Sequence, residues 1–266
     1  MRNVKNSGSR ADFHNVADSG DEHRRIVVFS AHAADFCSRT GGTIALYVSE
    51  GVQVHVVALT FGERGESEDY WRKAGHKSRA QAKKVRAREA EKAADILGAT
   101  IEFLDYDDYP LVVERDRLEA IARLLRKQRP GIVLTHWKVD PYNVDHEVTT
   151  ASVTRAATIS AVPGFDHDVS AVCQFPQIFG FEPTVPRDDL TGFVPDAYID
   201  ITKVFAVKCA ALKALRSQTK LVPWYTQWAQ YRAAQMTQWL GQPVKYAEAF
   251  RRYTASVGTR LPVIGF

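Results

Sequence analysis

Short apolar runs alternate with amphipathic stretches along most of the chain. The first run, Ile26–Ala31, is rich in β-branched and aromatic residues, as expected of a strand buried on both faces of a parallel sheet. Similar runs predict further strands at Val52–Thr60, Thr100–Leu104, Ile132–Thr135, Gln174–Phe181 and Tyr198–Thr202. We therefore expect a sheet of about six strands.

Helical periodicity fills most of the gaps between these strands. The clearest helix, Ser78–Leu97, carries apolar residues on one side and ends at Gly98. Further helices are predicted from Ser38 to about Ser49 and at Arg117–Lys127, Val148–Ser160, Val204–Arg216 and about Trp224–Leu240. This alternation predicts one α/β domain, a three-layer α/β/α arrangement with a Rossmann-like, mostly parallel sheet. Ligands of such sheets bind beyond the carboxyl ends of the strands, but no phosphate-cradling glycine loop follows Ile26–Ala31.

Composition narrows the function classes. The 266 residues carry a net charge of only +4, and the lysines and arginines gathered in Arg72–Arg88 are interpreted as a solvated helix face, which disfavours nucleic-acid binding. No apolar run is long enough to predict a membrane span. Residues 1–23 are polar and are expected to form a flexible arm before a domain over 24–266. Three cysteines at unrelated spacings indicate a reducing compartment, so a cytoplasmic location is expected.

Two polar motifs follow predicted strands and carry the candidate chemistry. His32 and Asp35 lie three residues apart after Ile26–Ala31, and His146 follows Ile132–Thr135 at a greater distance. Two imidazoles and a carboxylate are the ligands of an open catalytic zinc site, with one Zn²⁺ per chain. Asp145, beside His146, is a candidate to form a hydrogen bond with a metal ligand without binding the metal itself.

The motifs His32-x-x-Asp35, Gly41-Gly42-Thr43 and Asp145-His146, in this order, resemble those of the PIG-L/LmbE-like zinc deacetylases. The resemblance covers about Arg24 to Glu182. It implies an LmbE-like α/β fold and names His32, Asp35 and His146 as the zinc ligands.

The chain departs from this family at two positions. Ala34 stands where the deacetylases have an aspartate general base, and Asn143 stands where they often have a histidine. Each such group typically contributes about 10²–10⁴-fold to the rate, so an ordinary deacetylase is disfavoured.

Four segments resemble a narrower branch, the 4-oxalomesaconate hydratases of gallate and protocatechuate breakdown. They are Ser30–Phe36, Phe61–Ser67, Asp140–His146 and Tyr246–Phe250. The resemblance implies addition of water to an unsaturated oxo-tricarboxylate, which converts 4-oxalomesaconate to 4-carboxy-4-hydroxy-2-oxoadipate. This reaction releases no amine, which accounts for the missing acid–base pair.

Hydration still requires proton transfer. Glu63, in a glycine-flanked loop after Val52–Thr60, is predicted to activate water or to act as a variable zinc ligand. His167 is predicted to move the other proton. The resemblance also places catalytic groups in these two segments.

A tricarboxylate requires cationic partners. Arg64 and Arg72 are predicted to bind its carboxylates, and Tyr142 and Asn143 to act as neutral hydrogen-bond donors. We therefore expect a small anionic carboxylate as partner, and neither nucleic acid nor a membrane.

Two other functions stay open. One is a zinc N-deacetylase or amide hydrolase with a relocated base, for which Glu63 is the candidate. The other is a binding protein that keeps the metal without catalysis. The aromatic helix at Trp224–Leu240 fits both core packing and the interface of a homo-oligomer.

Overall fold

A seven-stranded sheet forms the middle of the molecule in the computed structural model, which describes residues 25–75, 77–167, 174–185 and 188–255. The predicted arm at 1–23 lies outside the described residues. The strands are β1 (Arg25–Ser30), β2 (Gln53–Ala58), β3 (Thr100–Phe103), β4 (Ile132–His136), β5 (Gln177–Phe181), β6 (Ala197–Asp200) and β7 (Ala247–Arg252). Their order is β3-β2-β1-β4-β5-β7-β6. The first five are parallel, and β7 runs antiparallel to both of its neighbours.

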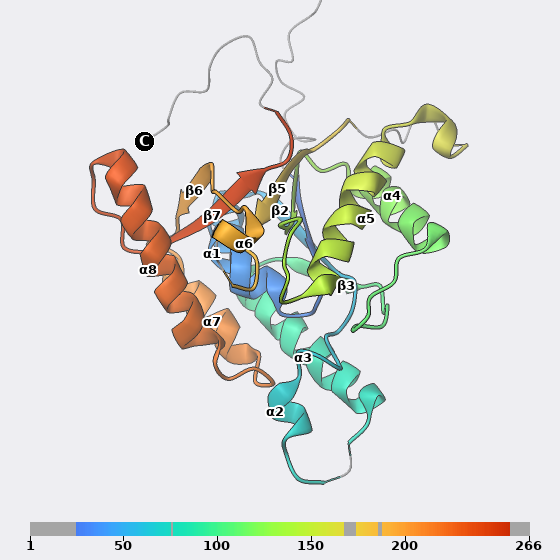
Figure 1. Cartoon of the computed structure of the whole chain (residues 1–266), viewed down its shortest axis with the longest axis horizontal. Coiled ribbons are helices and arrows are strands. Elements are labelled where there is room, and N and C mark those ends of the chain that lie inside the picture. The colour runs from blue at the N-terminus through green and yellow to red at the C-terminus, as the bar shows by residue number, and fades with distance from the viewer. Residues whose placement is uncertain (1–24, 76, 168–173, 186–187, 256–266) are drawn as a thin grey trace, which may run out of the picture.

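Helices cover both faces of this sheet (Figure 1). They are α1 (Asp35–Ser49), α2 (Glu68–Trp71), α3 (Arg79–Leu97), α4 (Arg115–Gln128), α5 (Val144–Ser160), α6 (Asp188–Thr191), α7 (Phe205–Ala214) and α8 (Leu221–Leu240), with a 3₁₀ turn at Pro163–Phe165. Helices α4 and α5 pack together on one face, while α1, α3 and α7 pack on the other. The predicted three-layer, mostly parallel α/β fold is confirmed. Within the described ranges, no helix combines the length and apolar character needed to cross a bilayer.

Alternation along β1 divides the core into two. Val27 and Phe29 pack with residues of α4 and α5, whereas Ile26 and Val28 pack with residues of α1, α3 and α7. All four side chains are buried. Successive side chains of a strand point to opposite faces, so a strand covered on both sides reads as a continuous apolar run.

Two elements near the candidate site begin earlier than their predicted bounds. Helix α1 begins at Asp35 rather than Ser38, and α5 begins at Val144 rather than Val148. The predicted ligands Asp35 and His146 therefore lie in first helical turns. Asp35 in α1 and Asp145 with His146 in α5 lie at the candidate site, and these polar residues interrupt the apolar periodicity from which the helix starts were predicted.

Candidate metal centre

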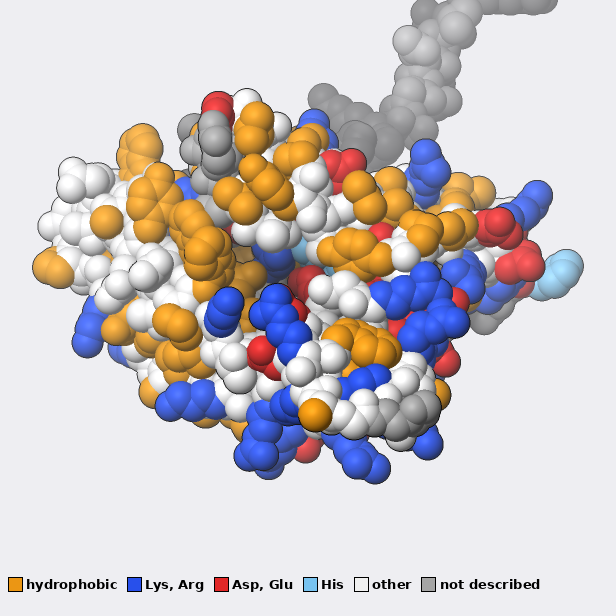
Figure 2. Space-filling model, turned by 60° about the horizontal axis from the view of Figure 1, so that its bottom comes forward, with side chains coloured by type: hydrophobic (Ala, Val, Ile, Leu, Met, Phe, Trp, Pro, Cys, Tyr) orange, Lys and Arg blue, Asp and Glu red, His pale blue; other side chains and the backbone are white. Residues whose placement is uncertain are grey.

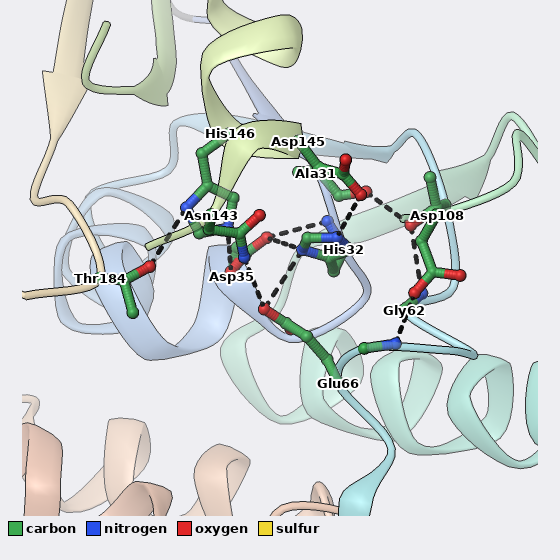
Figure 3. A network of polar contacts seen from close by, with 12 residues as sticks. Ala31, His32, Asp35, Gly62, Glu66, Asp108, Asn143, Asp145, His146 and Thr184 are labelled. Atoms are coloured by element: carbon green, nitrogen blue, oxygen red, sulfur yellow. Dashed lines mark hydrogen bonds and ion pairs between the residues drawn. The ribbon is translucent and has the colours of Figure 1, made fainter. Parts of the chain in front are cut away.

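The three predicted metal ligands meet at the carboxyl edge of the sheet (Figure 3). His32 follows β1, Asp35 is the first residue of α1, and His146 lies in the first turn of α5. The His32 backbone N–H donates to Asp35 Oδ2 over 2.8 Å, which fixes the turn between the two ligands. All three side chains are at most 3% exposed. The fold thus brings together residues separated by more than a hundred positions.

Glu66 joins this group from the loop after β2. Its Oε1 lies 3.2 Å from His32 Nδ1, which in turn lies 3.4 Å from Asp35 Oδ2. Asp35 Oδ1 is 3.5 Å from His146 Nε2. One ligand atom from each of the four residues lies within 4.8 Å of all the others. The shorter of these distances match the separation of about 3.3 Å expected between two ligand atoms that each lie about 2.0 Å from a tetrahedral ion.

A buried carboxylate orients each histidine. Asp145 Oδ2 lies 3.2 Å from His32 Nε2, and Asp140 Oδ2 lies 2.7 Å from His146 Nδ1. The opposite nitrogens, His32 Nδ1 and His146 Nε2, are buried without a hydrogen-bond partner among the described residues. A metal-binding imidazole donates its other N–H to a carboxylate in this way. The pair of unpartnered nitrogens beside two carboxylates therefore fits a divalent ion.

Charge in the metal-free site supports the same conclusion. Burial opposes a charge on His32, but the carboxylates of Glu66, Asp145 and Asp35 outweigh it and raise the His32 pKa well above 6.5. Burial also opposes a charge on Glu66, but the His32 imidazole lowers the Glu66 pKa. Without a metal, a protonated His32 thus supplies a positive charge among the carboxylates. A metal ion supplies that charge instead, and its binding releases the proton of the imidazole.

The neighbouring His136 is placed differently. Its Nε2 accepts the Ala31 backbone N–H over 2.9 Å, and its ring stacks on His146 with centroids 3.8 Å apart. Burial and the second imidazole lower its pKa to about 3, so it is neutral. Since its Nε2 lone pair is already used, His136 supports His146 rather than offering that nitrogen to a metal.

Neither predicted proton-transfer residue lies in the ligand group. The Glu63 carboxylate is 3.5 Å from Lys83 Nζ, and burial with the nearby charge of Asp108 raises its pKa. His167 is exposed, and its backbone N–H bonds Asp166. The catalytic roles of Glu63 and His167 stay predictions that this arrangement does not favour.

A tight turn explains why Glu66, rather than Glu63, approaches the ligands. Gly62 has a left-handed φ of 68°, and a Cβ there would lie 3.1 Å from the His32 Cβ. The Glu66 N–H then donates to the Gly62 carbonyl over 3.2 Å, which returns Glu66 toward His32. A glycine-flanked glutamate pair was the available signal in the sequence, but it could not show which carboxylate turns inward.

The predicted substrate-binding residues divide into two sets. Asn143 is buried, and its Nδ2 donates to Glu66 Oε1 over 3.4 Å, directly at the site. Arg64 is partly exposed and bonds the carbonyl of Tyr109. Arg72 is exposed and pairs with Glu68, and Tyr142 is 54% exposed. Figure 2 shows a hollow on this side of the molecule, with histidine and acidic side chains at its floor and basic ones around it.

The fold and the four-residue cluster define a metal-binding α/β protein with an open carboxyl-edge site. Residues 27–157 match the model of the PIG-L family, described as GlcNAc-PI de-N-acetylase. The chain is also 39% identical over 232 residues to a protein of Pseudomonas putida named 4-oxalmesaconate hydratase, covering 86% of this chain and 88% of that one. The chain belongs to the PIG-L family.

Solved structures and deacetylases give further comparisons. The structure of GalB, the 4-carboxy-2-hydroxymuconate hydratase of Pseudomonas putida, matches with a TM-score of 0.85 and 37% identity, over 90% of this chain and 99% of that one. Diacetylchitobiose deacetylase of Thermococcus kodakarensis is 27% identical over 217 residues, which span 79% of this chain and 75% of that one. Similar sequences therefore occur with two chemistries, hydration and deacetylation, among the names of these relatives.

Proposed function

We propose that this protein is a zinc-dependent hydratase that adds water to an unsaturated oxo-tricarboxylate of the 4-oxalmesaconate type, in the breakdown of aromatic compounds. Ala34 is the observation that carries the proposal. It is 2% exposed and lies between the ligands His32 and Asp35, in the hydrophobic cluster beneath the site. A methyl group thus occupies the position of the deacetylase base, while the metal-binding set is complete. Similarity to Pseudomonas putida hydratase, in sequence and in structure, supports the same interpretation.

A zinc ion held by His32, Asp35 and His146 would supply Lewis acidity toward the substrate oxygen and lower the pKa of a bound water. Glu66 lies at the edge of this set, with one carboxylate oxygen beside His32. In our proposal the Glu66 carboxylate accepts the proton of the attacking water and then, as the carboxylic acid, returns that proton to the adjacent carbon of the former double bond. The Asn143 amide holds that carboxylate in place through its hydrogen bond. Arg64, at the rim, binds a substrate carboxylate.

Two glutamates of one loop allow a matched test. Glu66→Gln keeps the size and hydrogen bonding of the side chain but removes its basicity, so kcat for hydration should fall about 10²–10⁴-fold. Glu63→Gln is the control, and it should keep near-native turnover because its carboxylate faces Lys83. The zinc content of both variants separates loss of a base from loss of a ligand. The reverse pattern, with Glu63→Gln inactive and Glu66→Gln active, would contradict the role of Glu66 and assign the activation of water to Glu63.

A zinc-dependent deacetylase is the second candidate, favoured by the shared ligand set and by the deacetylase relatives. One paired assay discriminates the two functions. Purified zinc-loaded protein and chelated protein are each tested on two substrates. Turnover of 4-oxalmesaconate is measured as the loss of its conjugated absorbance, and turnover of an N-acetylglucosamine derivative is measured as the release of amine. Zinc-dependent absorbance loss without amine release supports the hydratase. Amine release alone contradicts it.

A further inference from the structure

Tyr109 packs against the metal centre from the loop after β3. Its ring stacks on the imidazole of His32, with centroids 5.6 Å apart and planes 14° apart. Its backbone N–H donates over 2.8 Å to Asp145 Oδ2, the oxygen that also contacts His32 Nε2. Tyr109 has a φ of 40°, an uncommon conformation for a residue with a side chain. The hydrogen bond to Asp145 helps to hold this conformation, so the ring is fixed relative to the ligand.

Gly65 packs against the far edge of the Tyr109 ring. A Cβ at Gly65 would lie 2.1 Å from Tyr109 Cε2 and 2.8 Å from Cζ, the carbon that carries the hydroxyl. Gly65 does not have a left-handed φ, so close approach of the ring is the reason that a side chain does not fit. The hydroxyl-bearing end of Tyr109 is therefore packed against the segment that carries Glu66.

The Tyr109 hydroxyl makes no hydrogen bond to any residue that the structure describes, and the side chain is half-buried. Burial, with the carboxylate of Glu66 nearby, raises the pKa of this phenol, so it stays protonated at neutral pH. Tyrosine hydroxyls in such surroundings usually find a partner. A neutral donor thus stands beside the metal ligands without an acceptor from the described chain.

We propose that the Tyr109 hydroxyl donates a hydrogen bond to a carboxylate of the substrate bound at the metal centre, and so selects for polycarboxylates. This inference rests on the proposed hydratase function. The bond requires no proton transfer, since a neutral phenol and a carboxylate are already donor and acceptor. A hydrogen bond to a charged group of this kind corresponds to about tenfold to hundredfold in affinity.

Tyr109→Phe removes the hydroxyl and keeps the stacked ring. We expect kcat/KM for 4-oxalmesaconate to fall about tenfold to hundredfold, with zinc affinity and melting temperature unchanged. The dissociation constant of propane-1,2,3-tricarboxylate, a saturated probe measured by titration calorimetry, should rise by a similar factor. Tyr106→Phe is the matched control from the same loop, because the Tyr106 hydroxyl bonds the Arg117 carbonyl instead of facing the centre. It should leave both quantities at their native values.

Native kcat/KM and native probe affinity in Tyr109→Phe would overturn the inference, as would an equal loss in Tyr106→Phe. Failure of the proposed function gives a different result. In that case the native protein itself does not consume 4-oxalmesaconate, while the calorimetric comparison of the two variants still reports whether Tyr109 binds a carboxylate.

Discussion

Replacing Asp145 by asparagine tests whether the buried carboxylates, and not the ligands alone, make the metal centre. Asp145 is 0% exposed and accepts from two backbone N–H groups, those of Tyr109 over 2.8 Å and Leu111 over 2.9 Å. Its Oδ2 also contacts His32 Nε2 at 3.2 Å. The carboxylate therefore serves three buried donors.

An asparagine has one acceptor oxygen for these three donors, and its amide group would face an N–H. At least one buried donor then loses its partner, which costs about 1–3 kcal/mol in the free energy of unfolding. The imidazole of His32 also loses the anion that sets its tautomer and basicity. Removing such a partner typically lowers metal affinity about 10–100-fold, or about 1.4–2.8 kcal/mol.

Zinc affinity is measured by competition with a chromophoric chelator, and stability by urea unfolding of the metal-free protein. Glu102→Gln is the matched control, because Glu102 Oε1 bonds His55 Nε2 over 2.8 Å in a pair that is partly exposed and outside the ligand group. Exposed pairs of this type contribute little, so the control should be near native. Native zinc affinity in Asp145→Asn would refute the proposed orienting role.

Three further predictions concern the framework of the site. Gly42→Ala should lower the free energy of unfolding by about 1–3 kcal/mol, because the new Cβ would lie 2.6 Å from Ile201 Cδ1. Gly41→Ala is the control: its Cβ would meet nothing closer than 3.4 Å, so the same urea experiment should show a neutral or stabilising effect. Burial alone would raise the pKa of Asp140, but the hydrogen bond to His146 outweighs burial and lowers the Asp140 pKa from 3.8 to about 2. Its stabilising contribution, about 2 kcal/mol, should therefore be complete above about pH 5 and lost progressively as the pH falls toward about 1, a dependence that Asp140→Asn would lack. Cys37 is fully buried and burial raises its pKa, so iodoacetamide should modify it only after unfolding, as followed by mass spectrometry.

The grouping of His32, Asp35 and His146 could be predicted from sequence because strand ends and short spacings locate these residues. His32 and Asp35 belong to one turn, and the fold class places the end of β4 beside that of β1. The approach of Glu66 to this group depended on the path of a loop, since the left-handed φ of Gly62 helps to decide which glutamate turns inward. A backbone conformation of this kind is not visible in residue types.

Strand β7 shows a second limit of the sequence. Its residues Ala247–Arg252 lack an apolar run, and it contains the buried charge of Glu248. That carboxylate accepts the backbone N–H groups of Gly42 and Thr43 and pairs with Lys208. The strand is therefore stabilised by contacts with residues far away in the chain, which no local pattern reports. Patterns reveal elements that bury apolar surface, and they miss elements held by long-range polar contacts.

The four residues of the metal cluster all lie between positions 32 and 146, inside the stretch 27–157 that matches the family model. The later part of the chain reaches the cluster through Thr184, which bonds Asp140, and supports α1 through Glu248. The residues of the candidate metal cluster and some of the residues that brace it thus come from successive parts of one polypeptide. A substitution after residue 157 can therefore change the support of Asp140 or of α1 without changing any of the four clustered residues themselves.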